Sequence, residues 1–190
     1  MAFVRKHWAA LAVLAITALT VVVVRAEGRV WFCDCWKIRV WIASAWSEHT
    51  SQHSFDPYSL THVEHGLIFY WALAWLARRW SWQGRLVAAT AIEAAWEMVE
   101  NSPMVINRYR DATAALGYTG DSVVNVVGDV LACVLGFAVA RRLGTRGTLV
   151  LIAAIEVGLL IAIRDNLFLN VVMLFVPLEF IKEWQVAGQG

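Results

Sequence analysis

Residues 121–140 read DSVVNVVGDVLACVLGFAVA, an apolar run in which polar side chains recur every four residues. Asp121, Asn125 and Asp129 therefore lie on one face of a predicted helix. A charged side chain at the centre of a membrane-spanning helix costs about 2.5 to 3.5 kcal/mol, so polar residues in such a helix turn toward a buried polar site. The stretch predicts a membrane helix whose polar face contributes to the interior of a bundle. Asp121 is also expected to cap the N-terminus of this helix.

Two earlier apolar stretches, residues 58–77 and 86–103, repeat this pattern. They carry polar side chains three or four residues apart, namely His62, His65, Glu93, Glu97, Glu100 and Asn101. With a helical rise of about 1.5 Å per residue, counting from the helix ends puts His62, Glu97 and Asp129 roughly 6 to 12 Å below the outer membrane boundary. Asn170, in the last apolar stretch, falls within the same range. The sequence therefore predicts one polar layer built from several helices.

The overall composition favours a bilayer as the solvent. The 190 residues are 59% hydrophobic and 16% charged, and the mean hydropathy is +0.57. These values lie outside the range of an ordinary soluble domain. The expected partners are membrane lipids, homo-oligomerisation is an open alternative, and no nucleic-acid partner is predicted.

Long apolar runs predict an all-α, polytopic bundle of about six membrane-spanning helices in a single integral-membrane domain over residues 1–190. The spans are expected at 8–24, 58–78, 85–103, 121–140, 147–163 and 166–181. The number falls to five if the first span is a signal peptide cleaved after Ala26, or if the last is re-entrant. The first run is longer than a usual signal core, which favours an uncleaved span.

Basic residues in short loops set the expected orientation. They are Arg5, Lys6, Arg78, Arg79, Arg85, Arg141, Arg142 and Arg146. Because these loops contain almost no acids, the positive-inside rule predicts a multi-pass membrane protein with a cytoplasmic N-terminus. Residues 28–57 then form a loop on the outer side of the membrane, whose many tryptophans suit the headgroup region.

The polar layer has several chemical interpretations. His62 and His65 are candidate ligands of a divalent metal, because imidazole and carboxylate groups suit zinc, iron or manganese. Metal-free acid–base chemistry is an alternative. The candidate catalytic residues are Glu97, Asp129, Glu100 and Asn125. The sequence favours a purely structural interpretation, in which the polar residues form a hydrogen-bonded network that holds the helices together. The spacing of the histidines matches neither of the zinc motifs HExxH and HxxEH, which weakens the metal interpretation.

Arginines at the outer boundary are candidates for substrate binding. Arg108, Arg110 and Arg164 could hold an anionic headgroup through forked hydrogen bonds. A competing interpretation, which the sequence favours for the first two, is that an arginine pairs with Asp111 or Glu100 and ties the loop down.

The outer loop contains Cys33 and Cys35, which are separated by one residue. Pairing between two chains, redox chemistry, thiolate–metal binding and two simple thiols remain alternatives for this pair. Cys133 lies in the middle of an apolar run and is expected to pack as a small hydrophobe.

Several motifs of the chain resemble those of an uncharacterised protein family. They are SQHSFDPYSLTHVEHG at residues 51–66, WEMVENSP at 96–103, GDSVVNVVGD at 120–129 and RDN at 164–166. The family consists of multi-pass inner-membrane proteins of alphaproteobacteria, and the resemblance extends from about Gly28 to Trp184. It implies a location and a topology class. It carries over no functional residue, because no activity is established for the family.

The leading functional hypothesis is an enzyme, a hydrolase or transferase of lipid-linked substrates, whose site opens toward the periplasm. A small proton-coupled transporter is an alternative, because intramembrane carboxylates and histidines also mark ion pathways. Six spans without an internal repeat are few for a transporter. A second alternative is a non-catalytic assembly or scaffold protein, in which the polar groups only orient the helices.

Overall fold

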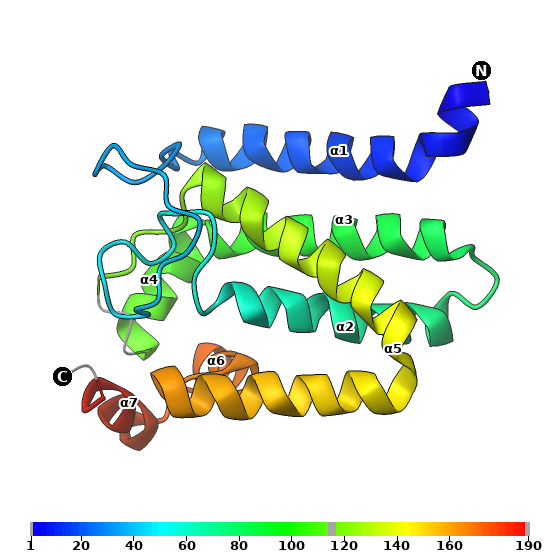
Figure 1. The fold of residues 1–190 in the computed structure, drawn as a ribbon. Helices are drawn as coiled ribbons and strands as arrows, with labels where there is room; N and C mark the ends of the chain where they lie inside the picture. The colour runs from blue at the N-terminus through cyan, green and yellow to red at the C-terminus, as the bar shows by residue number, and fades with distance from the viewer. Residues whose placement is uncertain (1, 114–116, 189–190) are drawn as a thin grey trace.

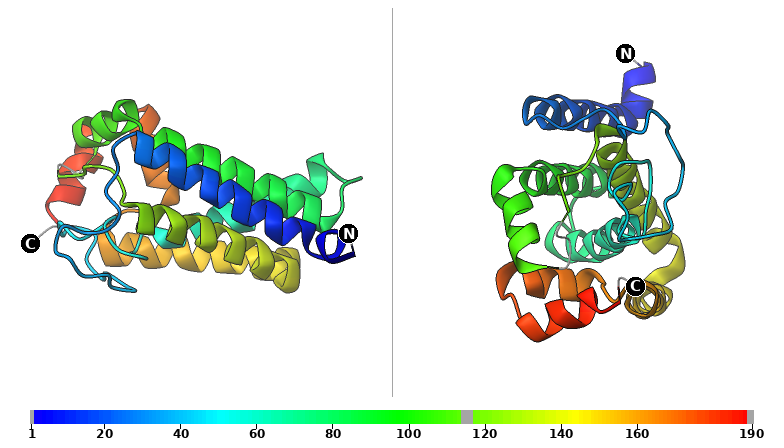
Figure 2. Two further views of the ribbon diagram at one scale, coloured as in Figure 1. Left: turned by 90° about the horizontal axis from the view of Figure 1, so that it is seen from above. Right: turned by 90° about the vertical axis from the view of Figure 1, so that its left-hand side faces the viewer.

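The computed structural model describes residues 2–113 and 117–188, and the chain in these ranges is all-α (Figure 1). Its seven helices are α1 (Ala2–Ala26), α2 (Ser59–Leu76), α3 (Trp82–Glu100), α4 (Pro103–Ala112), α5 (Val123–Ile163), α6 (Leu167–Phe175) and α7 (Glu179–Val186). The long helices lie side by side, with α1 along α3 and α2 against α5 (Figure 2). The irregular segment 27–58, α4 and α7 gather at one end of this bundle.

Glycines allow α2 and α5 to approach closely. A Cβ atom on Gly66 would lie 2.0 Å from the carbonyl oxygen of Cys133, and one on Gly136 would lie 2.0 Å from the carbonyl oxygen of Val63. Such distances are far inside van der Waals contact, so only glycine fits at either position. Helices that pack through small residues approach in this way. The contact fixes the face of α2 that carries the histidines against α5.

α5 is bent into two arms at Gly144, where φ is 67° and ψ is 179°. Just after the bend, the Thr148 hydroxyl donates to the Gly144 carbonyl oxygen at 2.8 Å and accepts the indole N–H of Trp71 at 3.1 Å. These bonds hold the bend against α2. The second arm therefore runs back toward the end of the bundle where α5 began (Figure 1).

Two stretches of the described chain are long and apolar enough to cross a membrane, His7–Ala26 within α1 and the whole of α5. The predicted bundle of about six spans is therefore wrong, and so is its five-span variant. α2 and α3 carry histidines and ionisable residues on their inner faces and are too polar for spans, although they form where spans were expected. The stretch predicted as a span at 166–181 is divided between the short helices α6 and α7, on either side of Pro177.

The two apolar helices suggest an association with a membrane, and they are packed differently. α1 exposes apolar side chains such as Leu14 and Val22, which are 66% and 64% accessible. In its last turn Val24 is buried and packs against Val123 and Val126 of α5. α1 is thus docked on the bundle along one side and presents an apolar face on the other.

Residues 27–58 are tied to the N-terminus of α5 by backbone hydrogen bonds. The N–H of Val123 donates to the carbonyl oxygen of Val30 at 2.8 Å, and the N–H of Ser122 donates to that of Ser51 at the same distance. The segment therefore closes over one end of the helices, where it forms part of the wall of the site described next.

Candidate functional site

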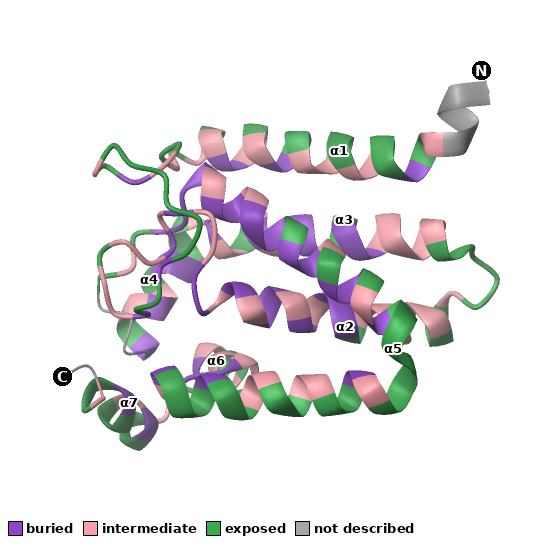
Figure 3. Cartoon of the chain, viewed as in Figure 1, coloured by how far each residue is buried: buried purple, intermediate pink, exposed green. Residues whose placement is uncertain are grey.

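A cavity of about 570 Å³ lies at the end of the bundle where residues 27–58, α4 and α6 meet. Buried residues are concentrated at this end (Figure 3). The polar lining includes Asp56, Tyr58, His62, His65, Glu100, Tyr109, Asp121, Asn125, Asp129, Asp165 and Asn170. The apolar lining includes Phe69, Ile92, Trp96, Val171, Leu174 and Phe175. The cavity is therefore amphipathic, with an acidic layer beside an aromatic and aliphatic wall.

His62 is the centre of the acidic layer and is buried on α2. Its Nδ1 lies 2.6 Å from Oε1 of Glu93 and 3.3 Å from Oε1 of Glu97, both on α3. Its Nε2 lies 4.0 Å from Oδ2 of Asp129 on α5. One imidazole is thus surrounded by three carboxylates. Their charge is balanced by a proton on the ring, by protons on the carboxyl groups or by a bound cation.

His65, one helical turn further along α2, shares Glu93 with His62. Its Nδ1 lies 3.0 and 3.2 Å from the two oxygens of Glu93, and its ring stacks on Phe69 with the centroids 5.8 Å apart. Glu93 is fully buried and bridges the two histidines. The two predicted histidines therefore meet in space and gain a third potential ligand, Glu93, which the sequence marked only as a member of the polar face of residues 86–103.

Three of the predicted catalytic residues carry buried polar atoms that have no hydrogen-bond partner among the described residues. These atoms are both carboxylate oxygens of Glu97, Oδ1 of Asp129 and Nδ2 of Asn125. Leaving a buried polar atom unsatisfied costs about 1 to 3 kcal/mol, and more for a charged group. Such groups in a native protein call for an explanation, and a bound ion, water or substrate supplies one.

Asp121 does not cap α5, contrary to the expectation from sequence. Ser122 is the N-cap, and its hydroxyl accepts the N–H of Asn125 at 3.3 Å. Asp121 instead pairs with Asn101 at the end of α3 through two hydrogen bonds of 2.7 and 2.8 Å, and it accepts the Tyr118 hydroxyl at 3.0 Å. Burial raises the pKa of Asp121, although these hydrogen bonds oppose the shift. The pair joins α3 to α5.

Glu100, the fourth predicted catalytic residue, ends α3 beside Tyr109 of α4. Burial and the neighbouring Asp121 raise the pKa of Glu100 to about 7, although a hydrogen bond from Tyr109 opposes the shift. A carboxyl that titrates near pH 7 can both give and take a proton under physiological conditions, as general acid–base catalysis requires.

Asp56, Tyr58 and Asp165 also belong to the cavity, and the sequence did not single them out as site residues. Asp56 accepts the N–H groups of Ser51 and Tyr58 at 2.7 and 2.8 Å, which orders the turn into α2. The Tyr58 hydroxyl donates to Asp165 Oδ2 at 3.2 Å. Burial raises the pKa of Asp165 to about 7. These residues lie in connecting segments, where no helical periodicity could mark them, and the local signals were the DPY sequence at 56–58 and the RDN sequence at 164–166.

The three candidate substrate-binding arginines hold helices and loops together outside the cavity lining. Arg108 donates to the carbonyl oxygens of Leu174 and Phe175 at 2.8 and 3.3 Å. Arg110 donates to the carbonyl oxygen of Tyr118. Arg164 donates to that of Trp184 at 2.9 Å and covers the Trp184 ring. In the described part of the chain these guanidinium groups bind main-chain carbonyls, rather than Asp111 or Glu100.

The comparison with known proteins agrees with the resemblance seen in the motifs. A family model for proteins of unknown function, DUF2585, matches residues 24–187. The chain belongs to the DUF2585 family. The match includes all the residues that line the cavity, so the cavity lies within the domain that defines DUF2585. The predicted membership of an uncharacterised alphaproteobacterial family is thus confirmed, and the family has no established activity.

Relatives of this DUF2585 chain are similar over almost their whole length. A UPF0314 protein of Brucella anthropi is 47% identical over 93% of this chain and 89% of its own length. One from Rhizobium meliloti is 45% identical over 92% and 89%. One from Sphingopyxis alaskensis is 43% identical over 97% of each. No solved structure matches this chain.

Proposed function

We propose that this DUF2585 chain is a membrane-associated, metal-dependent hydrolase or transferase of an amphiphilic, lipid-linked substrate. One observation carries the proposal. His62, His65 and Glu93 each offer a ligand atom, and these atoms lie within 4.8 Å of one another beside a cavity with unsatisfied carboxylates. A structural network alone would be expected to satisfy its own members, because partly satisfied buried networks are costly.

The ligand set suits a catalytic metal. Two imidazoles and one carboxylate form a three-ligand set for zinc that keeps a fourth position for water or substrate. In the structure the Glu93 carboxylate lies 2.6 Å from Nδ1 of His62 and 3.0 Å from Nδ1 of His65, so all three side chains converge on the place proposed for the metal. A divalent metal at this place would lower the pKa of a bound water and polarise an ester or phosphate oxygen.

The remaining polar groups have complementary roles in this proposal. Glu97 is the general base, because neither of its carboxylate oxygens accepts a hydrogen bond, although Oε1 lies within ion-pair distance of Nδ1 of His62, at 3.3 Å. Asn125 Nδ2 is a free donor for an oxygen of the substrate, and Asp129 faces His62 from the other side. Glu100, with a pKa of about 7, is placed to return a proton to a leaving group.

The cavity wall supports an amphiphilic substrate. Phe69, Trp96 and Phe175 line the cavity beside the acidic layer, so an acyl or prenyl chain can pack on the wall while a polar group reaches the carboxylates. No arginine lines the cavity among the described residues, so the proposal assigns Arg108, Arg110 and Arg164 to structure. The polar group is therefore expected to reach the acids through the metal.

The proposed location of the protein in the cell rests on the exposed apolar surface of α1 and on the basic residues near the N-terminus. We propose that α1 and α5 are embedded in the bacterial inner membrane, with the N-terminus in the cytoplasm and residues 28–57 in the periplasm. The exposed apolar face of α1 and the basic residues Arg5 and Lys6 support this orientation. The cavity then opens on the periplasmic side, where membrane lipids are the partner.

Metal content tests the proposal. Purified protein, loaded with zinc and washed, is expected to retain about one metal per chain at the cavity, and the His62→Ala/His65→Ala double variant is expected to lose it. A Cys33→Ser/Cys35→Ser variant is the matched control, since it removes two potential ligands elsewhere and should retain the cavity metal. Equal metal in the double variant and the wild type would contradict the proposal.

The lipids of cells test the reaction. A deletion strain complemented with Glu97→Gln is expected to show the same altered lipids as the deletion itself, while Asp111→Asn, an exposed carboxylate, restores the normal profile. A scaffold that only uses the network for stability predicts instead that Glu97→Gln lowers the amount of protein. Abundant, folded Glu97→Gln protein with normal lipids would exclude the enzyme.

A further inference from the structure

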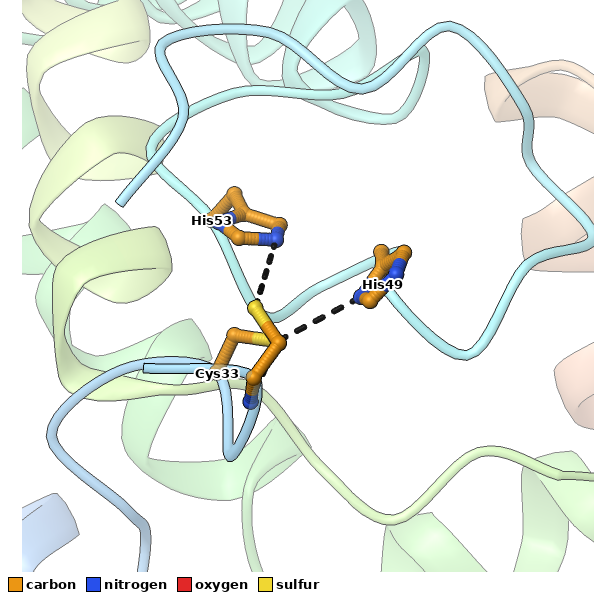
Figure 4. A group of neighbouring side chains, drawn as sticks. Cys33, His49 and His53 are labelled. Carbon is orange, nitrogen blue, oxygen red and sulfur yellow. Dashed lines mark hydrogen bonds between the residues drawn. A yellow bond between two sulfur atoms is a disulfide. The ribbon is translucent and has the colours of Figure 1, made fainter. Parts of the chain in front are cut away.

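A second cluster of reactive side chains lies in residues 27–58, outside the cavity lining. Cys33 and Cys35 form a disulfide, and the rings of His49 and His53 lie beside it (Figure 4). The four side chains bring potential ligand atoms within 4.8 Å of one another. The hydrolase proposal uses none of these four residues. The sequence marked the two cysteines but not the HxxxH spacing of the histidines.

Each sulfur atom of the disulfide lies near the imidazole of a different histidine. Nδ1 of His49 lies 3.3 Å from Sγ of Cys33, and Nε2 of His53 lies 3.8 Å from Sγ of Cys35. The N–H of Arg39 donates to Nδ1 of His53 at 3.1 Å. Because a neutral imidazole carries one proton, this bond leaves the proton on Nε2. His53 is therefore a hydrogen-bond donor to Cys35, and this tautomer cannot ligate a metal through Nε2.

The surrounding backbone keeps the imidazoles in place. The N–H of Cys33 donates to the Gln52 carbonyl oxygen at 3.0 Å, and the N–H of Ser54 donates to the Arg39 carbonyl oxygen at 3.2 Å. His53 itself is only 1% accessible. These bonds do not involve the disulfide. The cysteines are therefore expected to remain beside their histidines after the S–S bond is reduced.

The two cysteines differ in accessibility. Cys33 is buried, at 4%, whereas Cys35 is half-buried and can be reached from solvent. A thiolate forms and leaves more readily when a positive charge or hydrogen-bond donor stabilises it. The accessible sulfur is therefore also the one that faces the fixed N–H donor of His53.

We propose that Cys33 and Cys35 are an exchange-active disulfide that oxidises cysteine pairs of a partner protein. A partner thiolate attacks Sγ of Cys35, the Cys33–Cys35 bond breaks, and Cys33 leaves as a thiolate that takes up a proton. The second partner thiolate then attacks the partner sulfur of the mixed disulfide, and Cys35 leaves as a thiolate, which His53 stabilises and which then takes up a proton. The partner loses two electrons and two protons, and the cysteine pair gains both. A small-molecule disulfide of the glutathione type restores the pair by the same exchange.

A short dithiol peptide with a fluorescent readout of disulfide formation is the probe. Full-length protein is expected to oxidise one equivalent of peptide, and to turn over repeatedly when glutathione disulfide is added. Cys35→Ser should be inactive. Cys33→Ser lacks the disulfide and should oxidise no peptide by itself. After treatment with glutathione disulfide its Cys35 should carry one glutathione, visible as a mass increase, which the dithiol peptide then removes. Cys133→Ala is the matched control and should react like the wild type, because Cys133 is buried in α5.

The contribution of His53 to the rate of disulfide exchange is measured separately. His53→Ala is expected to slow peptide oxidation by about tenfold, which corresponds to losing one charge-assisted hydrogen bond. Because His53 is buried, the reaction of Cys35 with glutathione disulfide in Cys33→Ser serves as a second measurement that leaves the loop histidines unchanged.

Two results would overturn the proposal. The first is a rate for wild-type protein no faster than that for Cys35→Ser. The second is tight zinc binding by the reduced protein that is lost in both His49→Ala and His53→Ala and that blocks peptide oxidation. That result would assign the four residues to a metal site instead.

Discussion

At the scale of single residues, the cavity depends on paired side chains that come from different helices. Asn101 is fully buried and makes two hydrogen bonds with Asp121, one through the main-chain N–H of Asp121 and one through its carboxylate. It also donates to the Glu97 carbonyl oxygen at 3.1 Å. The side-chain amide of Asn101 thereby joins the C-terminus of α3 to Asp121, two residues before the start of α5.

Replacing Asn101 by alanine is expected to destabilise the fold by about 1 to 3 kcal/mol, because Asp121 keeps its burial and loses its partner. Chemical denaturation of detergent-solubilised protein measures the change. Asn107→Ala is the matched control, since Asn107 is exposed on α4 and should change stability by less than about 0.5 kcal/mol. A similar loss in both variants would contradict the role given to the pair.

The raised pKa of Asp165 predicts how the stability of the protein depends on pH. Its pKa is about 7 in the folded protein against 3.8 for an ordinary aspartate, so the folded state binds more protons than the unfolded state between these values. The contribution of Asp165 to stability is therefore largest below about pH 4 and is lost as the pH rises to 7. The melting temperature of Asp165→Asn should fall less steeply from pH 4 to 7 than that of the wild type. Parallel pH profiles would contradict the shift.

Residues on helical faces could be predicted, and residues in connecting segments could not. The spacing of His62, His65 and Glu97 is local, so a single sequence placed them in one layer, and the structure brings them together. Asp56 accepts its hydrogen bonds from the neighbouring Ser51 and Tyr58 within a turn that has no helical period. The contact of Asp165 with Tyr58 joins segments far apart in the sequence, so it is set by the tertiary fold. Periodicity carries no information about such contacts.

At the scale of helices, the contact of α2 with α5 positions the catalytic candidates. Gly66 and Gly136 allow the two backbones to touch, and this sets His62 opposite Asp129 at 4.0 Å. The sequence predicted both helices from their apolar runs. It did not predict that they are partners, because the glycines are ordinary in an apolar helix until the neighbouring backbone is known.

Gly136→Val is expected to separate α2 from α5 and to lower stability by about 1 to 3 kcal/mol or more, since the added atoms meet the Val63 backbone, which cannot move aside. Thermal unfolding, together with the metal content of the surviving protein, measures both consequences. Gly158→Ala is the matched control, because no atom lies within 4 Å of a Cβ at that position of α5. Equal stability of the Gly136 variant and the control would contradict the close approach.

At the scale of the whole molecule, the number of spans was the least predictable property. Hydropathy measures how apolar a helix is, but it does not tell whether lipid or protein covers the helix. The first arm of α5 is largely buried inside the fold, whereas its second arm and α1 are mostly exposed, although the apolarity of the two helices is similar. For α2 and α3, the side chains that build the cavity also make the helices too polar to count as spans.

The proposed orientation predicts which thiol is reached from outside. In cells with a permeable outer membrane, a membrane-impermeant reductant followed by an impermeant maleimide is expected to label Cys35 and to leave Cys133 unlabelled, since Cys133 is buried. Cys35→Ser is the control for specificity. Labelling of Cys35 only after the inner membrane is opened would reverse the orientation.

Gly144 has a consequence for how much membrane this chain can reach. A straight helix of 41 residues would be about 60 Å long, roughly twice the hydrocarbon thickness of a bilayer. At Gly144 the backbone adopts a conformation that is open almost only to glycine, and no atom would touch a Cβ there. Glycine at this position therefore lets α5 fold back on itself instead of forming a rod that protrudes far from the lipid. The residues at the two ends of the resulting hairpin, Asp121 and Asp165, both line the cavity.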